Sequence, residues 1–344
     1  MKDRVAVVGA GVSGLTCAAL FAEGGYHTAI FAEETGDRTT SAAAAAIWYP
    51  YDAGPADKVI AWALDTYKVL VDLCHESQSG VSLIELRTFS RTREIQIPEW
   101  AIPLGARRLS GSVTSSEVET SLAIPPKEIP AEFASGFALT VPLMDTTIYL
   151  DYLAKRFILA GGAIHQNIRF DAFEDVGRDF DLVINCSGMG AKALVPDADL
   201  ESHRGQIATV PKIDASYAIA CDDEPLTYAI PRTNDCLFGG TNELSDNREV
   251  DPSATLRIVA ECARILNLRP PKVLAERVGL RPFRKSGVCL HADQLGDGRT
   301  VIHNYGHGGS GFTLSWGCAQ KVLKLADNFF AGNDPTLTQS PERN

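Results

Sequence analysis

The first 34 residues constrain the fold most, because they predict a strand, a glycine-rich loop, a helix and a second strand in that order. Val5–Val8 is a short apolar run that is typical of a buried parallel strand, and Val12–Glu23 has helical periodicity. His27–Ala32 predicts a further strand, and the intervening Gly9–Gly14 reads Gly-Ala-Gly-Val-Ser-Gly. This order favours a β-α-β unit with a parallel sheet.

The spacing of the glycines in this loop indicates a dinucleotide site. The first glycine permits a tight turn, the second admits a pyrophosphate, and the third allows close packing of helix on strand. The helix N-terminus supplies N–H donors to the phosphates. An acidic pair follows the second strand, about 20 residues beyond the loop, where an acid would accept hydrogen bonds from ribose hydroxyls. The predicted contacts are Gly9, Ala10, Gly11, Val12, Ser13, Gly14, Glu33 and Glu34.

A second glycine cluster near the C-terminus favours a flavin dinucleotide over a nicotinamide dinucleotide as the cofactor. Residues 303–313 contain four glycines within six positions and open a helix. A nicotinamide site needs no second loop of this kind, whereas a reduced flavin carries negative charge that a helix N-terminus stabilises. The cofactor predicted here is therefore FAD. His303 and His307 precede this helix without a neighbouring acidic motif, so no metal site is expected.

Composition excludes several classes of partner. The 344 residues carry a net charge of −11, and the absence of a Lys/Arg cluster argues against a nucleic-acid-binding face. No apolar stretch approaches the roughly 18 residues that would suggest a membrane span. The eight cysteines form no CxxC pair. We expect them to be reduced thiols in a cytoplasmic protein.

Short β runs and prolines between Val81 and Leu143 predict a separate antiparallel sheet. The expected fold class is α/β, with a discontinuous Rossmann-like FAD-binding domain and an inserted β-rich domain for substrate binding or an interface. The FAD-binding domain is predicted over 1–75, 141–195 and 272–331, the inserted domain over 76–140 and 196–271, and a flexible tail over 332–344.

Six segments together resemble D-amino-acid oxidases, in order and nearly from end to end. They are Gly9–Leu15, 39–51, Asn185–Gly188, Tyr228–Pro231, Gly279–Pro282 and His303–Thr313. The chain looks like a bacterial member of this FAD-dependent family, whose nearest sister is D-aspartate oxidase.

The resemblance implies oxidative deamination of a D-amino acid to a 2-oxo acid, ammonia and hydrogen peroxide, by hydride transfer to flavin N5 and reoxidation by molecular oxygen. The handedness of the substrate comes only from the resemblance, as does the expectation of a homodimer. By the same resemblance, Arg281 and Tyr228 hold the substrate carboxylate and the Gly309 carbonyl orients the amine. The nearby Arg284 is expected to be structural.

Further contacts are implied in the same way. For the substrate they are Ser310 and Tyr49, although relatives carry other polar residues at position 49. For the cofactor they are Thr39, Thr40, Ser41, Ala45, Ala46, Ile47, Arg169, Phe170, Ser187, Gly188, Arg281, Gly308, Gly309, Ser310, Gly311, Phe312 and Thr313.

The acidic segment Asp222-Asp223-Glu224 precedes Tyr228 and is expected at the entrance of the site. Its charge would repel an acidic side chain, so neutral or basic D-amino acids are expected to be preferred over D-aspartate. The alternatives are a D-aspartate oxidase, an FAD amine oxidase for glycine or N-methyl amino acids, an NAD(P)-dependent dehydrogenase and a non-catalytic flavoprotein.

Overall fold

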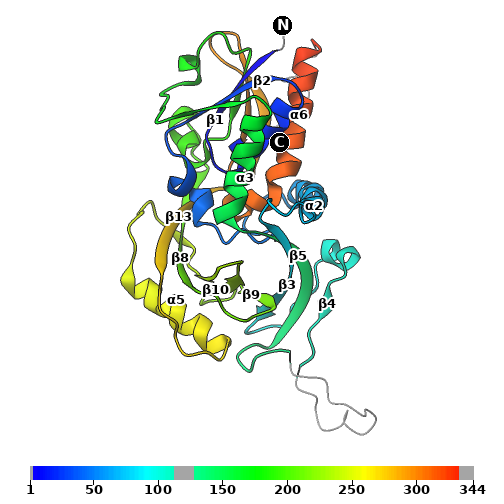
Figure 1. Cartoon of the computed structure of the whole chain (residues 1–344), viewed down its shortest axis with the longest axis vertical. Helices are drawn as coiled ribbons and strands as arrows, with labels where there is room; N and C mark the ends of the chain where they lie inside the picture. Colours follow the sequence, from blue (N-terminus) through cyan, green and yellow to red (C-terminus); the bar gives the residue numbers. More distant parts are fainter. Residues whose placement is uncertain (1–2, 112–127, 333–344) are drawn as a thin grey trace.

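The computed structural model describes residues 3–111 and 128–332. The predicted tail over 332–344 therefore lies outside the described residues except for its first position. Two β-sheets organise the chain (Figure 1), one with helices α1, α3 and α6 in the upper part and one with helix α5 in the lower part. Within the described residues, no helix is long and apolar enough to cross a membrane.

The upper sheet has six strands in the order β14-β15-β7-β1-β2-β6. They are β1 (Arg4–Val8), β2 (His27–Ala32), β6 (Ala163–Gln166), β7 (Leu182–Asn185), β14 (Cys289–Gln294) and β15 (Thr300–Tyr305). All neighbours in this sheet run parallel except the β14–β15 pair. The predicted β-α-β unit and Rossmann-like sheet are thus confirmed.

Four helices accompany this sheet: α1 (Val12–Glu23), α2 (Ala56–Leu73), α3 (Thr146–Leu159) and α6 (Gly311–Phe330). Helix α6 packs against both α1 and α2. Its approach to α2 is close, because a Cβ at Gly317 would lie 2.2 Å from the carbonyl oxygen of Trp62. The Gly317 N–H also donates to Thr66 Oγ1 at 2.9 Å, which fixes the start of α6 against α2.

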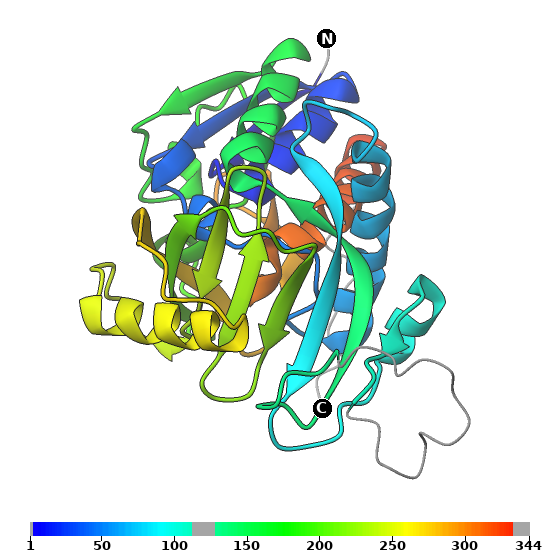
Figure 2. The same ribbon diagram turned by 60° about the horizontal axis from the view of Figure 1, so that its bottom comes forward.

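The lower sheet has nine strands in the order β12-β8-β11-β10-β9-β3-β5-β4, with β13 also paired to β8. They are β3 (Val81–Ser90), β4 (Arg107–Arg108), β5 (Ser135–Met144), β8 (Leu200–Pro211), β9 (Tyr217–Cys221), β10 (Thr227–Pro231), β11 (Asp235–Gly239), β12 (Glu243–Leu244) and β13 (Ala275–Arg284). Helix α5 (Pro252–Ile265) packs on β8, β10 and β11 (Figure 2), burying Ile258, Val259 and Cys262. The predicted β-rich second region is confirmed, but β3 and β9 run parallel, so the sheet is mixed rather than antiparallel.

Two predicted domain boundaries fall inside this lower sheet. Strand β5 extends to Met144, beyond the boundary expected near 140. Strand β13 was expected in the FAD-binding domain with the rest of 272–331, yet it pairs along its whole length with β8, where Arg281 lies opposite His203. A strand pattern in the sequence predicts an extended segment but does not identify the strand with which it pairs. In this structure β13 pairs with β8. The other boundaries stay predictions.

Candidate active site

A cavity of about 850 Å³ contains the glycine loop after β1, the turn before α6, and residues of β10 and β13 in its lining. Of the residues predicted to contact cofactor or substrate, all line it except Gly14 and Ser310. The two glycine-rich segments and Arg281 therefore share one cavity, although they are far apart in the sequence. The isolated bridge between Phe283 and His307 also joins β13 to the second glycine turn.

The first glycine loop forms a cradle that side chains would fill. Gly9 has φ +112, and a Cβ there would lie 2.3 Å from the carbonyl oxygen of Cys186. A Cβ at Gly14 would lie 2.0 Å from the Gly9 carbonyl oxygen, so Gly14 serves helix packing and does not line the cavity. Ser41 Oγ accepts a hydrogen bond from the Val12 N–H at 2.9 Å, which ties residues 39–46 to the start of α1.

Two hydroxyl groups at the start of α6 hold the segment that carries Tyr49 and Tyr51. Ser310 Oγ accepts from the Tyr51 N–H at 2.8 Å and donates to the Tyr51 carbonyl oxygen. Thr313 Oγ1 accepts from the Tyr49 N–H at 3.2 Å and donates to the Tyr49 carbonyl oxygen at 3.0 Å. Ser310 is thus buried and positions Tyr51, and it does not itself line the cavity, so its direct contact with substrate and cofactor stays a prediction.

Tyr228 on β10 and Arg281 on β13 both reach the cavity from the lower sheet. Arg281 Nη1 donates to the Thr241 carbonyl oxygen at 2.9 Å and to Asn242 Oδ1 at 3.1 Å. The guanidinium lies against Gly205, where a Cβ would be 2.3 Å from Nη2. These contacts hold Nη1 in place, and a guanidinium carries further N–H donors in the planar arrangement that suits a carboxylate.

The tyrosine hydroxyls of the cavity are neutral hydrogen-bond donors at physiological pH. Burial raises the pKa of Tyr49 to about 12, and burial raises the pKa of Tyr51 to about 12 against the opposing charge of Arg281. Burial also raises the pKa of Tyr228, again opposed by Arg281. Arg281 and three neutral phenols thus form the polar wall of this part of the cavity.

His307 supports the glycine turn as a neutral imidazole. Burial lowers its pKa to about 4, and its Nε2 lies 3.0 Å from Asn304 Oδ1. His303 faces elsewhere, with Nδ1 against Asn185 and Nε2 against Asp293. The two histidines considered together in the sequence therefore have separate surroundings.

Of the three acids expected at the entrance, only Asp222 lines the cavity. Burial, followed by the charge of Asp223, raises the pKa of the Asp222 carboxyl. The Asp223 carboxylate instead accepts from Ser90 Oγ at 2.8 Å and from the Arg91 N–H at 2.6 Å. Within the segment 222–224, the Asp222 carboxyl group is therefore the one that can act on a bound substrate.

The predicted acids after β2 both form ion pairs at the cavity wall. Glu33 Oε1 lies 3.4 Å from Arg169 Nη1, and Glu34 Oε1 lies 2.9 Å from Arg248 Nη1. Arg248 belongs to the segment after β12, so its pair with Glu34 links the two sheets across the cavity.

Sequence reasoning missed Tyr51, Asn242 and Arg248 as site residues. Tyr51 follows Pro50 within a recognised motif, but no local pattern shows that Ser310 turns it into the cavity. Asn242 and Arg248 lie in a polar stretch that reads as an ordinary loop. Arg284 pairs with Asp197 at 2.7 Å, which confirms its expected structural role.

Comparison with known proteins places this site in a class. Residues 4–325 match the family described as FAD dependent oxidoreductase. The chain is 36% identical over 327 residues to a D-amino-acid oxidase of Rubrobacter xylanophilus, covering 94% of this chain and 95% of that protein. It is 37% identical over 333 residues to a D-amino-acid oxidase of Streptomyces coelicolor, covering 94% and 96%.

The solved structure of glycine oxidase from Geobacillus kaustophilus has a TM-score of 0.75 to this chain, at 16% identity and with 100% and 97% of the two chains covered. This likeness concerns the fold. The fold and the glycine cradle define an FAD-dependent oxidoreductase. Within that class, the chain belongs to the D-amino-acid oxidase family.

FAD is therefore the cofactor, as predicted. The cradle at Gly9 and the N-terminus of α1 fit its pyrophosphate, because both bring backbone close to an anion. The turn before α6 offers a second helix N-terminus for the flavin end.

Proposed function

We propose that this chain catalyses the oxidative deamination of D-amino acids, with neutral side chains preferred over acidic ones. The products are a 2-oxo acid, ammonia and hydrogen peroxide, with water and molecular oxygen consumed. The observation that carries the proposal is the shared cavity of the two glycine turns, Tyr228 and Arg281. The D-amino-acid oxidases that the chain resembles support the handedness.

In this mechanism the protein binds and orients the substrate. Arg281 takes the carboxylate through a guanidinium that Thr241 and Asn242 hold in place, and the neutral Tyr228 hydroxyl donates to the same group. The Gly309 carbonyl is proposed to accept from the amine. FAD, when bound, supplies the acceptor for the Cα hydrogen and its electron pair. The contribution of this chain to the rate is then mainly the fixed geometry of the substrate.

Asp222 supports the proposed side-chain preference. The charges that act on the Tyr51 hydroxyl include those of Arg281 and Asp222, and Asp222 lines the same cavity as Arg281, so an acidic group lies near the proposed carboxylate site. When the Asp222 carboxyl is ionised, a second carboxylate on the substrate about 7 Å away would face repulsion of about 1 kcal/mol at an effective dielectric constant of about 40. This amounts to roughly fivefold in kcat/KM.

The test is a comparison of peroxide formation from D- and L-amino acids, followed by kcat/KM for D-alanine and D-aspartate. We expect activity with D-amino acids and a higher kcat/KM for D-alanine than for D-aspartate. Asp222→Asn should raise the D-aspartate to D-alanine ratio about fivefold. Glu224→Gln is the matched control, because Glu224 lies on the same hairpin outside the cavity. Faster turnover of D-aspartate by the unmodified enzyme would contradict the preference.

We also propose a cytoplasmic location, which eight cysteines without a disulfide support. The expected homodimer stays a prediction, to be measured by sedimentation velocity.

A further inference from the structure

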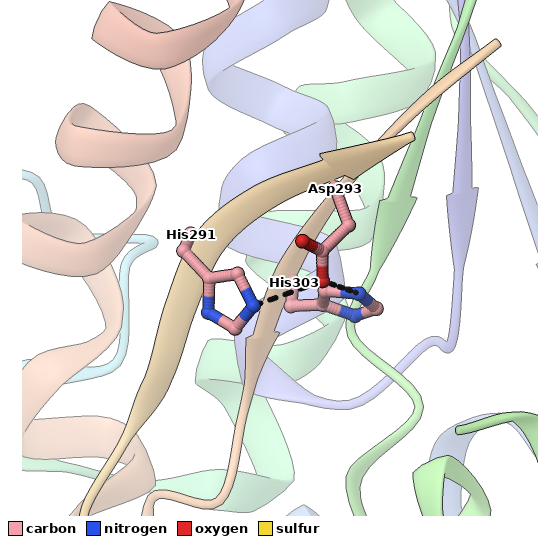
Figure 3. Close-up of side chains that lie close together, drawn as sticks. All are labelled: His291, Asp293 and His303. Atoms are coloured by element: carbon pink, nitrogen blue, oxygen red, sulfur yellow. Dashed lines mark hydrogen bonds and ion pairs between the residues drawn. The ribbon is translucent and has the colours of Figure 1, made fainter. Parts of the chain in front are cut away.

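The β14–β15 hairpin carries three side chains that the proposed reaction does not use. His291 and Asp293 lie two positions apart on β14 and therefore share a face, and the register places His303 of β15 opposite His291. Figure 3 shows the three side chains turned toward one another. They do not line the cofactor cavity.

Their potential ligand atoms are close enough to share one metal ion. His291 Nε2 lies 3.0 Å from Asp293 Oδ2, His303 Nε2 lies 3.4 Å from the same oxygen, and all three ligand atoms fall within 4.8 Å of one another. Ligands at 2.0–2.2 Å from a tetrahedral zinc ion are about 3.3 Å apart, so modest side-chain rotations would suffice. Across residues 3–111 and 128–332, this is the one group of three His, Cys, Asp or Glu with such spacing.

Charge and burial also suit a metal site. The Asp293 carboxylate faces both imidazoles and would supply an anionic oxygen ligand to the ion. The His303 side chain is 4% exposed and forms a buried anchor, whereas 39% of His291 and 55% of Asp293 is exposed. An ion could therefore enter from solvent and retain a water ligand.

We propose that His291, Asp293 and His303 bind one zinc ion, with water completing a tetrahedral shell. Two imidazoles and a carboxylate are ligands that zinc accepts readily, whereas magnesium and calcium prefer all-oxygen sites. The site lies outside the cavity and does not depend on the proposed reaction.

Asn185 restricts how the His303 ring can bind a metal ion, because it contacts the other ring nitrogen. Its Nδ2 lies 3.0 Å from His303 Nδ1, and its Oδ1 accepts from the Ser187 N–H at 3.2 Å and from Ser187 Oγ at 2.6 Å. In this arrangement His303 Nδ1 accepts and Nε2 carries the proton that faces Asp293. Zinc at Nε2 displaces that proton, and the neutral ring then carries its proton on Nδ1, where it needs an acceptor.

The Asn185 amide can offer that acceptor only by turning over and giving up its bonds to Ser187, which lines the cofactor cavity. The present hydrogen bonds of Asn185 to His303 and Ser187 therefore weaken zinc binding. Asn185→Asp would present an oxygen to both neighbours, so this variant should bind zinc at least tenfold more tightly than the unmodified protein.

The test is calorimetric titration of the untagged, chelator-treated holoenzyme with zinc chloride, with flavin absorbance checked for each variant. We expect one zinc per chain, at least a tenfold loss of affinity in His291→Ala and in Asp293→Asn, and tighter binding in Asn185→Asp. His27→Ala, which removes an exposed histidine at the start of β2, should leave zinc binding unchanged. Absence of binding to the unmodified protein, or undiminished binding to His291→Ala, would overturn the site. Equal or weaker binding by Asn185→Asp would contradict ligation through His303 Nε2.

Discussion

Gly205→Ala tests whether Arg281 acts through its position. An alanine Cβ would lie 2.3 Å from Arg281 Nη2, 2.5 Å from Cζ and 2.6 Å from Nη1, whereas ordinary contacts begin near 3.4 Å. The guanidinium is the far end of a flexible side chain, so it should move by about 1 Å while the sheet keeps its structure. A displacement of that size can cost about 100-fold in rate, or about 2.7 kcal/mol.

The assay is steady-state kcat/KM for D-alanine, with flavin content and thermal unfolding measured on the same samples. Flavin content should stay unchanged, because Gly205 belongs to β8 of the lower sheet and the nucleotide cradle follows β1. Arg281→Ala alone should lower kcat/KM by about 30-fold to several thousand-fold, the usual range for truncating one partner of a buried charge pair.

The double variant Gly205→Ala/Arg281→Ala shows whether Gly205→Ala lowers kcat/KM only by displacing Arg281. If Gly205→Ala acts only through the guanidinium, adding it to Arg281→Ala should change kcat/KM by less than about twofold. Normal kinetics in Gly205→Ala, or a full additional loss in the double variant, would refute this reasoning.

Three further predictions concern stability and cofactor binding. Ser310→Ala removes both hydrogen bonds to the Tyr51 backbone and should lower the free energy of unfolding by about 1–3 kcal/mol in urea titrations. An unchanged urea midpoint would show that these two hydrogen bonds do not stabilise the fold. Because burial lowers the pKa of His307 to about 4, the unfolded chain binds a proton that the folded chain excludes, so roughly 3 kcal/mol of stability should disappear as pH falls from 6.5 to 4. His307→Gln should lose that part of the acid sensitivity, and an identical pH profile would disprove the assignment. Gly14→Ala should lose bound flavin and lower Tm, because its Cβ would lie 2.0 Å from the Gly9 carbonyl oxygen; retention of both would contradict the cradle.

The sequence predicted the parts of the site that local patterns encode. The Gly9–Gly14 loop requires a particular turn, and the glycines before α6 open a helix, so both could be interpreted from short segments. Arg281 and Tyr228 came from the family resemblance, and the structure brings both to the same cavity. What each of these two residues does in the reaction stays a proposal.

The remaining features depend on contacts between distant segments. Strand β13 is recognisable as a strand, but its place in the lower sheet is decided by pairing with β8. Ser310 lies in a glycine-rich turn of the kind that binds cofactors, yet its hydroxyl hydrogen-bonds to the backbone of Tyr51, 259 positions away. The grouping of His303 with His291 and Asp293 likewise depends on the register of a hairpin rather than on spacing along the chain.

The most direct test of the account is an anaerobic titration of the purified holoenzyme with D-alanine, followed by the flavin absorbance band and by assay of the 2-oxo acid formed. We predict that the band bleaches with the D-enantiomer, that one 2-oxo acid forms per flavin, and that L-alanine leaves the band unchanged. An unaltered band with a panel of neutral D-amino acids, or equal bleaching by L-alanine, would contradict it.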